Sequence, residues 1–361
     1  MRAWVIGFLT VGVLGCGSSS NGAAGSSNDA DAGGVDAGDD SASAADNGTT
    51  PTWTAFGARG SDSRWGVPVA YASKHAAFIA FSGSQYPGPV AGGTFSLAMA
   101  TGTWTKLGDV NPPDPRYCGC TTYLPDQDQV LLIGGQAGVG PLPPGAWTLD
   151  LATSTWTAVS GPLPNGVIGC AAAYMPGMGK AIVFGGLSPT QMLGETWAYD
   201  PVKASFTLLS PVSHPTPRAD SIAAYDPGDG GRMLVFAGTS DEVHATGHDN
   251  DLWAFDGTTW TELHPSGGPP STRRVAAGGF DANRRRWVVF SGTDETADRD
   301  DLWLLDAASL TWTELPKGGA PSARGFASAG YDPTTDSYVV VGGLRQPSFA
   351  LMTDGWKLEL R

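Results

Sequence analysis

Short apolar runs recur along this chain at a nearly constant spacing. Six of them are continuous stretches of four apolar residues, each followed by a small residue and then a glycine: 78–81, 130–133, 181–184, 233–236, 287–290 and 338–341. A run of this kind, bounded by turn residues, is typical of a strand covered on both faces. The stretch before a run is built of small residues, as in 170–173 and 275–278. This predicts a crowded strand beside each buried one.

Aromatic residues mark the same period. Ten of the 13 tryptophans fall in two registers. The first register is the centre of a Thr-Trp-Thr motif or a close variant, with spacings of 50 to 54 residues, at positions 53, 104, 156, 206, 260 and 312. The second comprises positions 95, 147, 197, 253, 303 and 356. An arginine register, interrupted at Val167, comprises Arg64, Arg116, Arg218, Arg273 and Arg324. The chain therefore contains one unit written six times.

Each unit holds four strand-like runs separated by turns rich in Gly, Pro and Asp. Its motifs are an aromatic–Asp pair such as Tyr225-Asp226, a small residue and glycine such as Ala237-Gly238, and a tryptophan strand such as the one at Trp253. Together they resemble the kelch repeat, whose period is also about 50 residues. The resemblance covers residues 52–361. It implies an all-β fold, a six-bladed kelch-type β-propeller.

The order of the motifs predicts how the ring closes. The repeats begin with a fourth-strand motif at Trp53 and end with a third-strand motif at Trp356. We therefore expect the N-terminal strand to complete the last blade. This arrangement would leave no unpaired edge where the ends of the ring meet.

The residues before the repeats carry targeting signals. Arg2 and the apolar run 3–14 are typical of a signal peptide and too short to span a bilayer. Residues 13–16, Val-Leu-Gly-Cys, resemble the lipobox of bacterial lipoproteins. The resemblance implies a signal peptide over 1–15, a lipid on Cys16, and a destination in the bacterial cell envelope, at the outer membrane. The alternative is an ordinary signal peptide with a chance cysteine. Residues 16–51, rich in Gly, Ser, Ala and Asp, are predicted to be a flexible tether.

The composition of the chain argues against one class of binding partner. The chain has 21 Lys+Arg against 35 Asp+Glu and a formal net charge of −14, which argues against nucleic-acid binding because phosphates require a basic surface. Its 51 glycines and 27 prolines argue against long helices. We expect a monomer that contacts the membrane only through its lipid anchor.

Loop lengths predict which face carries a binding site. Connections between strands one and two, and between three and four, are short. The others are long, differ between units, and should emerge on one face, where variable loops on a rigid scaffold usually bind ligands. The arginine register opens onto this face and could clamp an anion, although periodic residues more often bond within their own blade. Neighbouring residues that differ between units complete the candidate site: Trp65, Tyr117, Asn165, Asp220 and Arg274.

Two smaller groups have further chemistry. His244, His248 and Asp249 in the fourth unit are ligand types for zinc or calcium. Gly247 opposes a helix that would align the two histidines, so a solvated loop is the favoured alternative. Cys170 aligns between two cysteines of the preceding unit and could form a disulfide with either Cys118 or Cys120.

Three functions fit these features. The favoured one is a membrane-anchored, extracytoplasmic module that binds a protein or a glycan with its long-loop face. The second is a carbohydrate-active enzyme, because galactose oxidase and a sialic-acid mutarotase have kelch-type blades. No Tyr–His–Cys copper cluster is apparent at equivalent loop positions, however, and no hydrolase, phosphate-loop or zinc-protease motif occurs. The third is a structural envelope protein. The sequence therefore favours binding over catalysis and predicts no cofactor.

Overall fold

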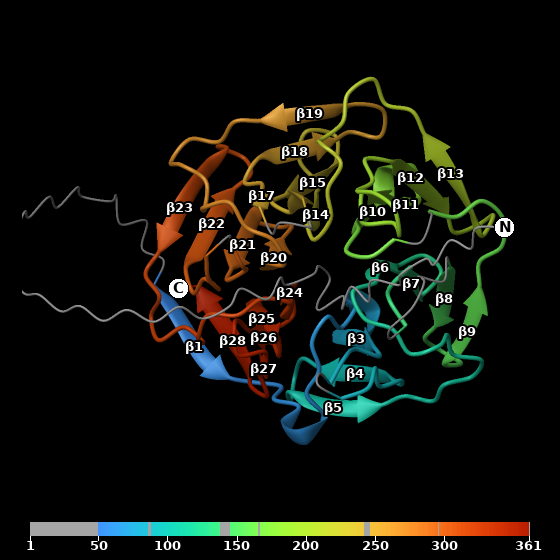
Figure 1. The fold of residues 1–361 in the computed structure, drawn as a ribbon, viewed down its shortest axis with the longest axis horizontal. Helices are drawn as coiled ribbons and strands as arrows, with labels where there is room; N and C mark the ends of the chain where they lie inside the picture. The colour runs from blue at the N-terminus through green and yellow to red at the C-terminus, as the bar shows by residue number, and fades with distance from the viewer. Residues whose placement is uncertain are drawn as a thin grey trace, which may run out of the picture.

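The chain forms a ring of six four-stranded antiparallel sheets around a central axis (Figure 1). The computed structural model describes residues 50–85, 88–137, 145–164, 167–241, 246–294 and 296–360. The predicted all-β, six-bladed propeller is confirmed. The predicted signal peptide, Cys16 and nearly all of the predicted tether fall in residues 1–49, outside the described residues.

The first three blades follow one another along the chain. Blade 1 comprises β2 (Val69–Ala72), β3 (Ala77–Phe81), β4 (Thr94–Ala98) and β5 (Thr103–Lys106). Blade 2 comprises β6 (Cys120–Leu124), β7 (Gln129–Ile133), β8 (Ala146–Asp150) and β9 (Thr155–Ala158). Blade 3 comprises β10 (Ala171–Met175), β11 (Lys180–Phe184), β12 (Thr196–Asp200) and β13 (Ser205–Leu209). Three 3-10 turns accompany the described strands: η1 (Gly60–Asp62), η2 (Ser73–His75) and η3 (Pro176–Met178).

The last three blades complete the ring. Blade 4 comprises β14 (Ile222–Asp226), β15 (Arg232–Phe236), β18 (Leu252–Phe255) and β19 (Trp260–Leu263). Blade 5 comprises β20 (Ala277–Asp281), β21 (Arg286–Phe290), β22 (Leu302–Asp306) and β23 (Thr311–Leu315). Blade 6 comprises β24 (Ser328–Asp332), β25 (Ser337–Val341), β28 (Gly355–Leu360) and β1 (Pro51–Ala55). Two small hairpins lie outside the blades: β16 (Thr239–Asp241) with β17 (Thr246–His248), and β26 (Leu344–Arg345) with β27 (Ala350–Leu351).

The N-terminal strand closes the ring as predicted. β1 pairs antiparallel with β28, with Trp53 opposite Leu358 and Ala55 opposite Trp356. Trp53 is buried and packs against Phe290 of blade 5, with ring centroids 5.2 Å apart. The first strand of the repeats therefore joins the last one, and blade 6 presents no open edge at the seam.

The second strand of each blade is buried on both sides, as its continuous apolar run predicts. In β15, Met233 and Val235 pack into a cluster with blade 3, whereas Leu234 and Phe236 pack with blade 5. Alternate side chains of one strand thus serve two neighbouring interfaces, because successive residues point to opposite faces of a sheet.

Five of the six glycines that follow an apolar run donate a hydrogen bond to the next blade. Gly238 has φ +114° and donates its N–H to the carbonyl of Arg273 in the next blade at 2.9 Å. A Cβ added here would lie 2.8 Å from the carbonyl oxygen of Ala219. The corresponding N–H groups of Gly83, Gly135, Gly186 and Gly292 make the same bond to the following blade. This position therefore requires glycine for both its φ angle and its close contacts.

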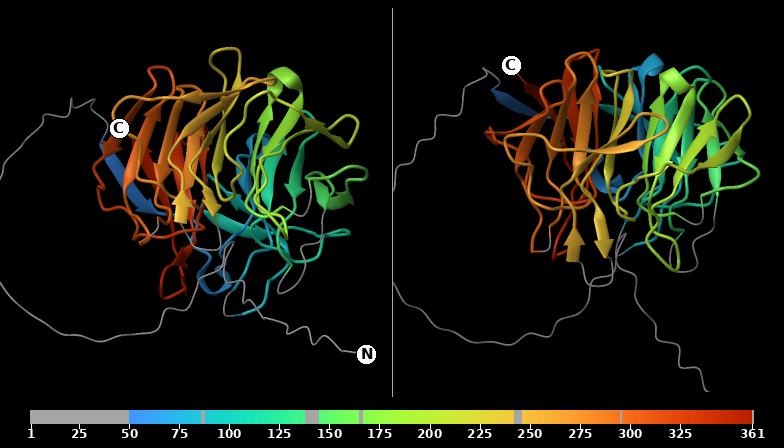
Figure 2. Two further views of the ribbon diagram at one scale, coloured as in Figure 1. Left: turned by 45° about the horizontal axis from the view of Figure 1, so that its top comes forward. Right: turned by 90° about the horizontal axis from the view of Figure 1, so that it is seen from above.

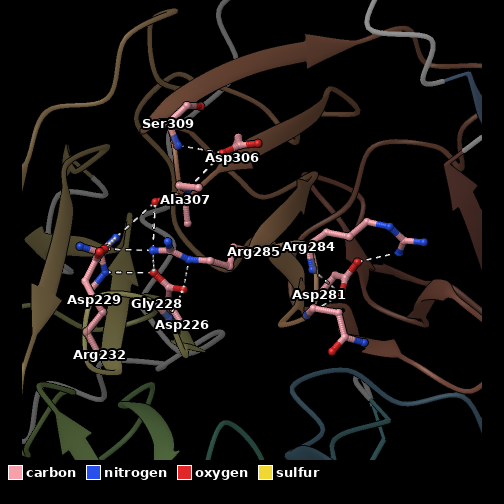
Figure 3. Close-up of polar contacts among 12 residues, drawn as sticks. Asp226, Gly228, Asp229, Arg232, Asp281, Arg284, Arg285, Asp306, Ala307 and Ser309 are labelled. Carbon is pink, nitrogen blue, oxygen red and sulfur yellow. Dashed lines mark hydrogen bonds and ion pairs between the residues drawn. The ribbon is translucent and has the colours of Figure 1, made fainter.

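We call the face that carries the short turns the plain face. Ion pairs join its blades (Figure 3). Arg285 of blade 5 donates to both carboxylate oxygens of Asp226 in blade 4, at 2.8 and 2.9 Å, and to Asp229 at 3.0 Å. Burial alone would raise the pKa of Asp226, but the bonds from Arg285 hold that pKa below its ordinary value. Arg284 links blades 5 and 6 in the same way through Asp336. This face is therefore occupied by contacts between blades.

We call the opposite face the loop face, because it carries the long connections, including the hairpins β16–β17 and β26–β27 (Figure 2). Among the residues that the structure describes, there is no helix with the length and apolar character needed to cross a bilayer.

Candidate functional site

The five repeat arginines lie inside the blades rather than at the mouth of the loop face. Arg273 is fully buried, and its guanidinium donates to the Ser291 carbonyl at 2.9 Å and to both oxygens of Asp301 at 2.7 Å. Asp301 also accepts the indole N–H of Trp303 at 2.8 Å. Blades 4 and 6 repeat this arrangement with Arg218–Asp251–Trp253 and Arg324–Asp354–Trp356.

Blades 1 and 2 satisfy their arginines differently. Arg64 bonds Asp62 at 2.8 Å and the carbonyls of Ser82 and Ala91. Arg116 bonds the Gly134 carbonyl at 3.0 Å and lies over the ring of Trp147, 4.0 Å from its centroid. Of the two alternatives that the sequence left open for the register, the structure favours bonding within the blade over a ligand-facing role. These side chains are buried and donate hydrogen bonds to acceptors of their own blades, which favours a structural role.

The residues just after each arginine reach the axis instead. Six residues, each two positions after a repeat arginine or after Val167, lie around the axis: Gly66, Cys118, Gly169, Asp220, Val275 and Phe326. In five of them the N–H donates to the carbonyl of the corresponding residue in the preceding blade, from Cys118 N to Gly66 O at 2.6 Å through Phe326 N to Val275 O at 3.2 Å. All six have φ between +49° and +61°. We call this the axial ring. Next to it, the inner strands line a channel of about 210 Å³.

One half of the axial ring is covered by an apolar cluster. Trp65 packs against Tyr117 and against Phe326, each with ring centroids 5.0 Å apart. Ile168 and Leu344 join the same cluster. Its members come from blades 1, 2, 3, 5 and 6, so it lies where the blades converge. Trp65 is buried, and its indole N–H has no acceptor in the described part of the chain.

The other half of the ring is ionic. Asp220 of blade 4 and Arg274 of blade 5 approach to 3.7 Å, with only 3% and 7% of their side chains exposed. Neither Asp220 Oδ2 nor Arg274 Nε and Nη1 has a hydrogen-bond partner among the described residues. Burial raises the pKa of Asp220 to about 7, although Arg274 opposes this shift. Both charged groups therefore have unused hydrogen-bonding atoms, and a polar group of a ligand could bind to them.

Two further acids on this face have raised pKa values. Burial raises the pKa of Asp249 to about 6, and Asp251 adds to the shift while Arg218, 3.6 Å away, opposes it. Burial also raises the pKa of Asp298, which accepts bonds from the Thr293 hydroxyl and the Gln346 N–H at 2.7 and 2.6 Å. Neither Asp298 nor Phe326 is among the residues that the sequence predicted for the site. Phe326 follows its arginine by two residues, as Asp220 does, and this shared spacing could have identified it.

The structure thus brings together four of the predicted non-repeat site residues, Trp65, Tyr117, Asp220 and Arg274, around the axial ring. Asn165, the fifth, lies outside the described residues.

The predicted metal group is described only in part. His244 falls outside the described residues, whereas His248 ends β17 and Asp249 follows it. In the part of the chain that the structure covers, no three His, Cys, Asp or Glu residues are placed to hold a metal ion.

A disulfide joins Cys120, at the start of β6, to Cys170, just before β10, with their Cα atoms 5.6 Å apart. The structure therefore selects Cys120 from the two partners that the sequence left open. This covalent bond links the inner edges of blades 2 and 3.

Comparisons with known proteins agree with the repeat. The Kelch-repeats domain of KLHDC2/KLHL20/DRC7 matches residues 210–361. Acyl-CoA-binding domain-containing protein 5 of Arabidopsis thaliana is 31% identical over 114 residues, which are 31% of this chain and 17% of that protein. A Kelch repeat-containing protein of Arthroderma benhamiae is 30% identical over 122 residues, which are 30% of this chain and 18% of that protein. The chain thus spans less than a fifth of these relatives. The six-bladed fold and the match over residues 210–361 together support a β-propeller of the kelch type.

Proposed function

We propose that this protein is an interaction module whose axial site, formed by Trp65, Tyr117, Asp220 and Arg274, binds a polar group presented by a partner protein. The observation that carries the proposal is the set of buried polar atoms without partners. Each such atom costs about 1–3 kcal/mol when it is desolvated and unbonded. An amide of the partner could accept from Arg274 and donate to Asp220. Binding would then supply the hydrogen bonds that these buried atoms do not make in the free protein.

Peptide selection with matched variants tests this proposal. A phage-displayed random peptide library is selected on the purified protein and counter-selected on Arg274→Gln. We expect the selected peptides to bind Arg274→Gln and Asp220→Asn at least about tenfold more weakly, because each variant removes a charged hydrogen-bonding group. The matched control is Arg299→Gln, which changes a half-exposed arginine elsewhere on the loop face. Peptides that bind all variants equally would contradict an axial site, and selective binding on a glycan array would identify a glycan ligand instead.

We propose in addition that Cys16 anchors the protein by lipid to the bacterial outer membrane, outside the cytoplasm. The support is the sequence at 13–16, with the apolar run before it and the linker-like composition after it. Cys16→Ser should move the protein from the membrane fraction to the soluble fraction, because the acyl chains supply the membrane affinity. Incorporation of labelled palmitate provides a second readout. A Cys16→Ser protein that still resists carbonate extraction would contradict the anchor.

A further inference from the structure

Blade 3 differs from the other blades in the interior of its loop-face end. Val167 occupies the position of the repeat arginine, because its carbonyl accepts the N–H of Gly135 just as the Arg218 carbonyl accepts that of Gly186. Val167 is buried in an apolar cluster with Leu193 and the half-buried Leu163. No guanidinium therefore enters blade 3 from its own repeat.

The acid that the arginine would bond is nevertheless present. Glu195 accepts the indole N–H of Trp197 at 2.8 Å, as Asp251 accepts that of Trp253 at 2.7 Å. Its carbonyl accepts the N–H of Gly185, which matches the bond from Ala237 to Asp251. Glu195 is thus the structural equivalent of the paired aspartates. Among the described residues, no lysine or arginine forms an ion pair with it.

Glu195 lines an open groove of about 490 Å³ at the outer side of blade 3. One wall is apolar and formed by Met192, Leu208 and Leu209. A second wall comes from the segment 210–217, in which three prolines restrict the backbone. This wall packs closely over Gly194, whose added Cβ would lie 3.2 Å from Pro217 and 3.5 Å from the His214 ring. We call this the Glu195 groove. Its volume falls within the range of about 300–1,000 Å³ that is usual for ligand pockets.

We propose that the Glu195 groove binds an arginine side chain presented by a partner polypeptide. The repeat itself provides the charge complementarity. In blades 4, 5 and 6 the carboxylate–indole pair holds a guanidinium through two hydrogen bonds, as Asp301 does with both nitrogens at 2.7 Å. Blade 3 keeps the carboxylate and the indole, but Val167 takes the place of the arginine. Planar guanidinium matches a carboxylate in a way that an ammonium does not, and Leu208, 49% exposed, can cover the aliphatic stem.

Synthetic peptides can test this directly. The probe is an acetylated and amidated pentapeptide, Gly-Leu-Arg-Leu-Gly, compared with the same peptide containing citrulline or lysine in place of arginine. The readout is the indole N–H signal of Trp197 in NMR spectra of the full-length protein, assigned by its loss in Trp197→Phe. We expect the arginine peptide to shift this signal. The citrulline peptide should bind at least about tenfold more weakly, because it lacks the charge.

Two variants separate the roles of the acid and the missing arginine. Glu195→Gln keeps an acceptor for Trp197 but removes the charge, so it should weaken the arginine peptide about tenfold. Val167→Arg supplies a guanidinium from within the chain and should compete with the peptide. Glu262→Gln is the control, because it removes an exposed carboxylate of β19 outside the groove. Arg274→Gln should leave this binding unchanged, which separates the groove from the axial site. Equal binding of arginine and citrulline peptides, or an unchanged affinity in Glu195→Gln, would overturn the proposal.

Discussion

Arg273 and Arg274 are adjacent in the chain but lie in two contrasting regions of the molecule. Arg273 is enclosed by its blade and donates to a serine carbonyl and to both oxygens of Asp301. Arg274 lies at the axial ring, 3.7 Å from Asp220, with two nitrogens that lack partners among the described residues. Both are buried, so burial alone does not distinguish them. The difference is whether the protein itself supplies hydrogen-bond partners for the side chain, and the region without them is the one that we propose as the binding site.

The largest expected effect is the loss of a repeat arginine. Arg273→Met should reduce the free energy of unfolding by about 3–5 kcal/mol, because it removes a fully buried guanidinium and leaves the largely buried carboxylate of Asp301 without its cation. Urea denaturation followed by tryptophan fluorescence would measure this. Lys317→Met, which removes one partner of an ion pair with Asp300 in which both side chains are about half-exposed, serves as the control and should change stability little. A small effect at Arg273 would mean that the repeat arginines are dispensable for the fold.

Sequence reasoning reached the fold because its signals are repeated six times and do not depend on any single contact. The glycine after each apolar run and the strand motif at Trp53 predicted the blades and their closure. The same periodicity could not show which way the arginines point, because a register is equally visible inside a blade or at its mouth. The contact between Asp220 and Arg274 joins two blades across 54 residues, and nothing local in the sequence marks it.

Val167 shows a second limit of prediction from the sequence. The interruption of the arginine register at this position is visible in the sequence. Its consequence for Glu195 is visible only once the structure shows that the arginine bonds the acid two residues before the tryptophan of the third strand. The sequence therefore shows where the repeat is interrupted. To identify the residue that loses its partner, one must first see the contacts in a blade whose repeat is complete.

The pH dependence of stability should differ in sign between the two regions. Burial raises the pKa of Asp220 to about 7 from an ordinary value of 3.8. The folded protein therefore binds more protons than the unfolded chain between about pH 4 and pH 7, and this term reduces stability as the pH rises through that window, by at most about 4 kcal/mol. Asp249 acts in the same direction. For Asp301, burial is outweighed by Arg273 and the pKa is lowered, so its contribution is lost as the pH falls below 4.

Asp220→Asn isolates the axial part of this dependence. The amide resembles the protonated carboxyl, so the variant should match the parent protein near pH 4 and exceed it in stability at pH 8. Chemical denaturation at a series of pH values would show a flatter profile between pH 4 and pH 7. A profile identical to that of the parent would mean that Asp220 does not change its protonation on folding.

The smallest expected effect is that of the axial arginine itself. Arg274→Met replaces a buried guanidinium whose Nε and Nη1 are unbonded with an apolar side chain of similar length. The desolvation penalty of the charge disappears with it, and Asp220, whose pKa is about 7, can remain neutral at pH 6 without its neighbour. We therefore expect the free energy of unfolding at pH 6 to change by less than about 1 kcal/mol in either direction. Denaturation of Arg273→Met and Arg274→Met side by side provides the measurement. A loss at Arg274 as large as that at Arg273 would show that both arginines hold the fold together, and the axial site would then lose its distinction from the blade interior.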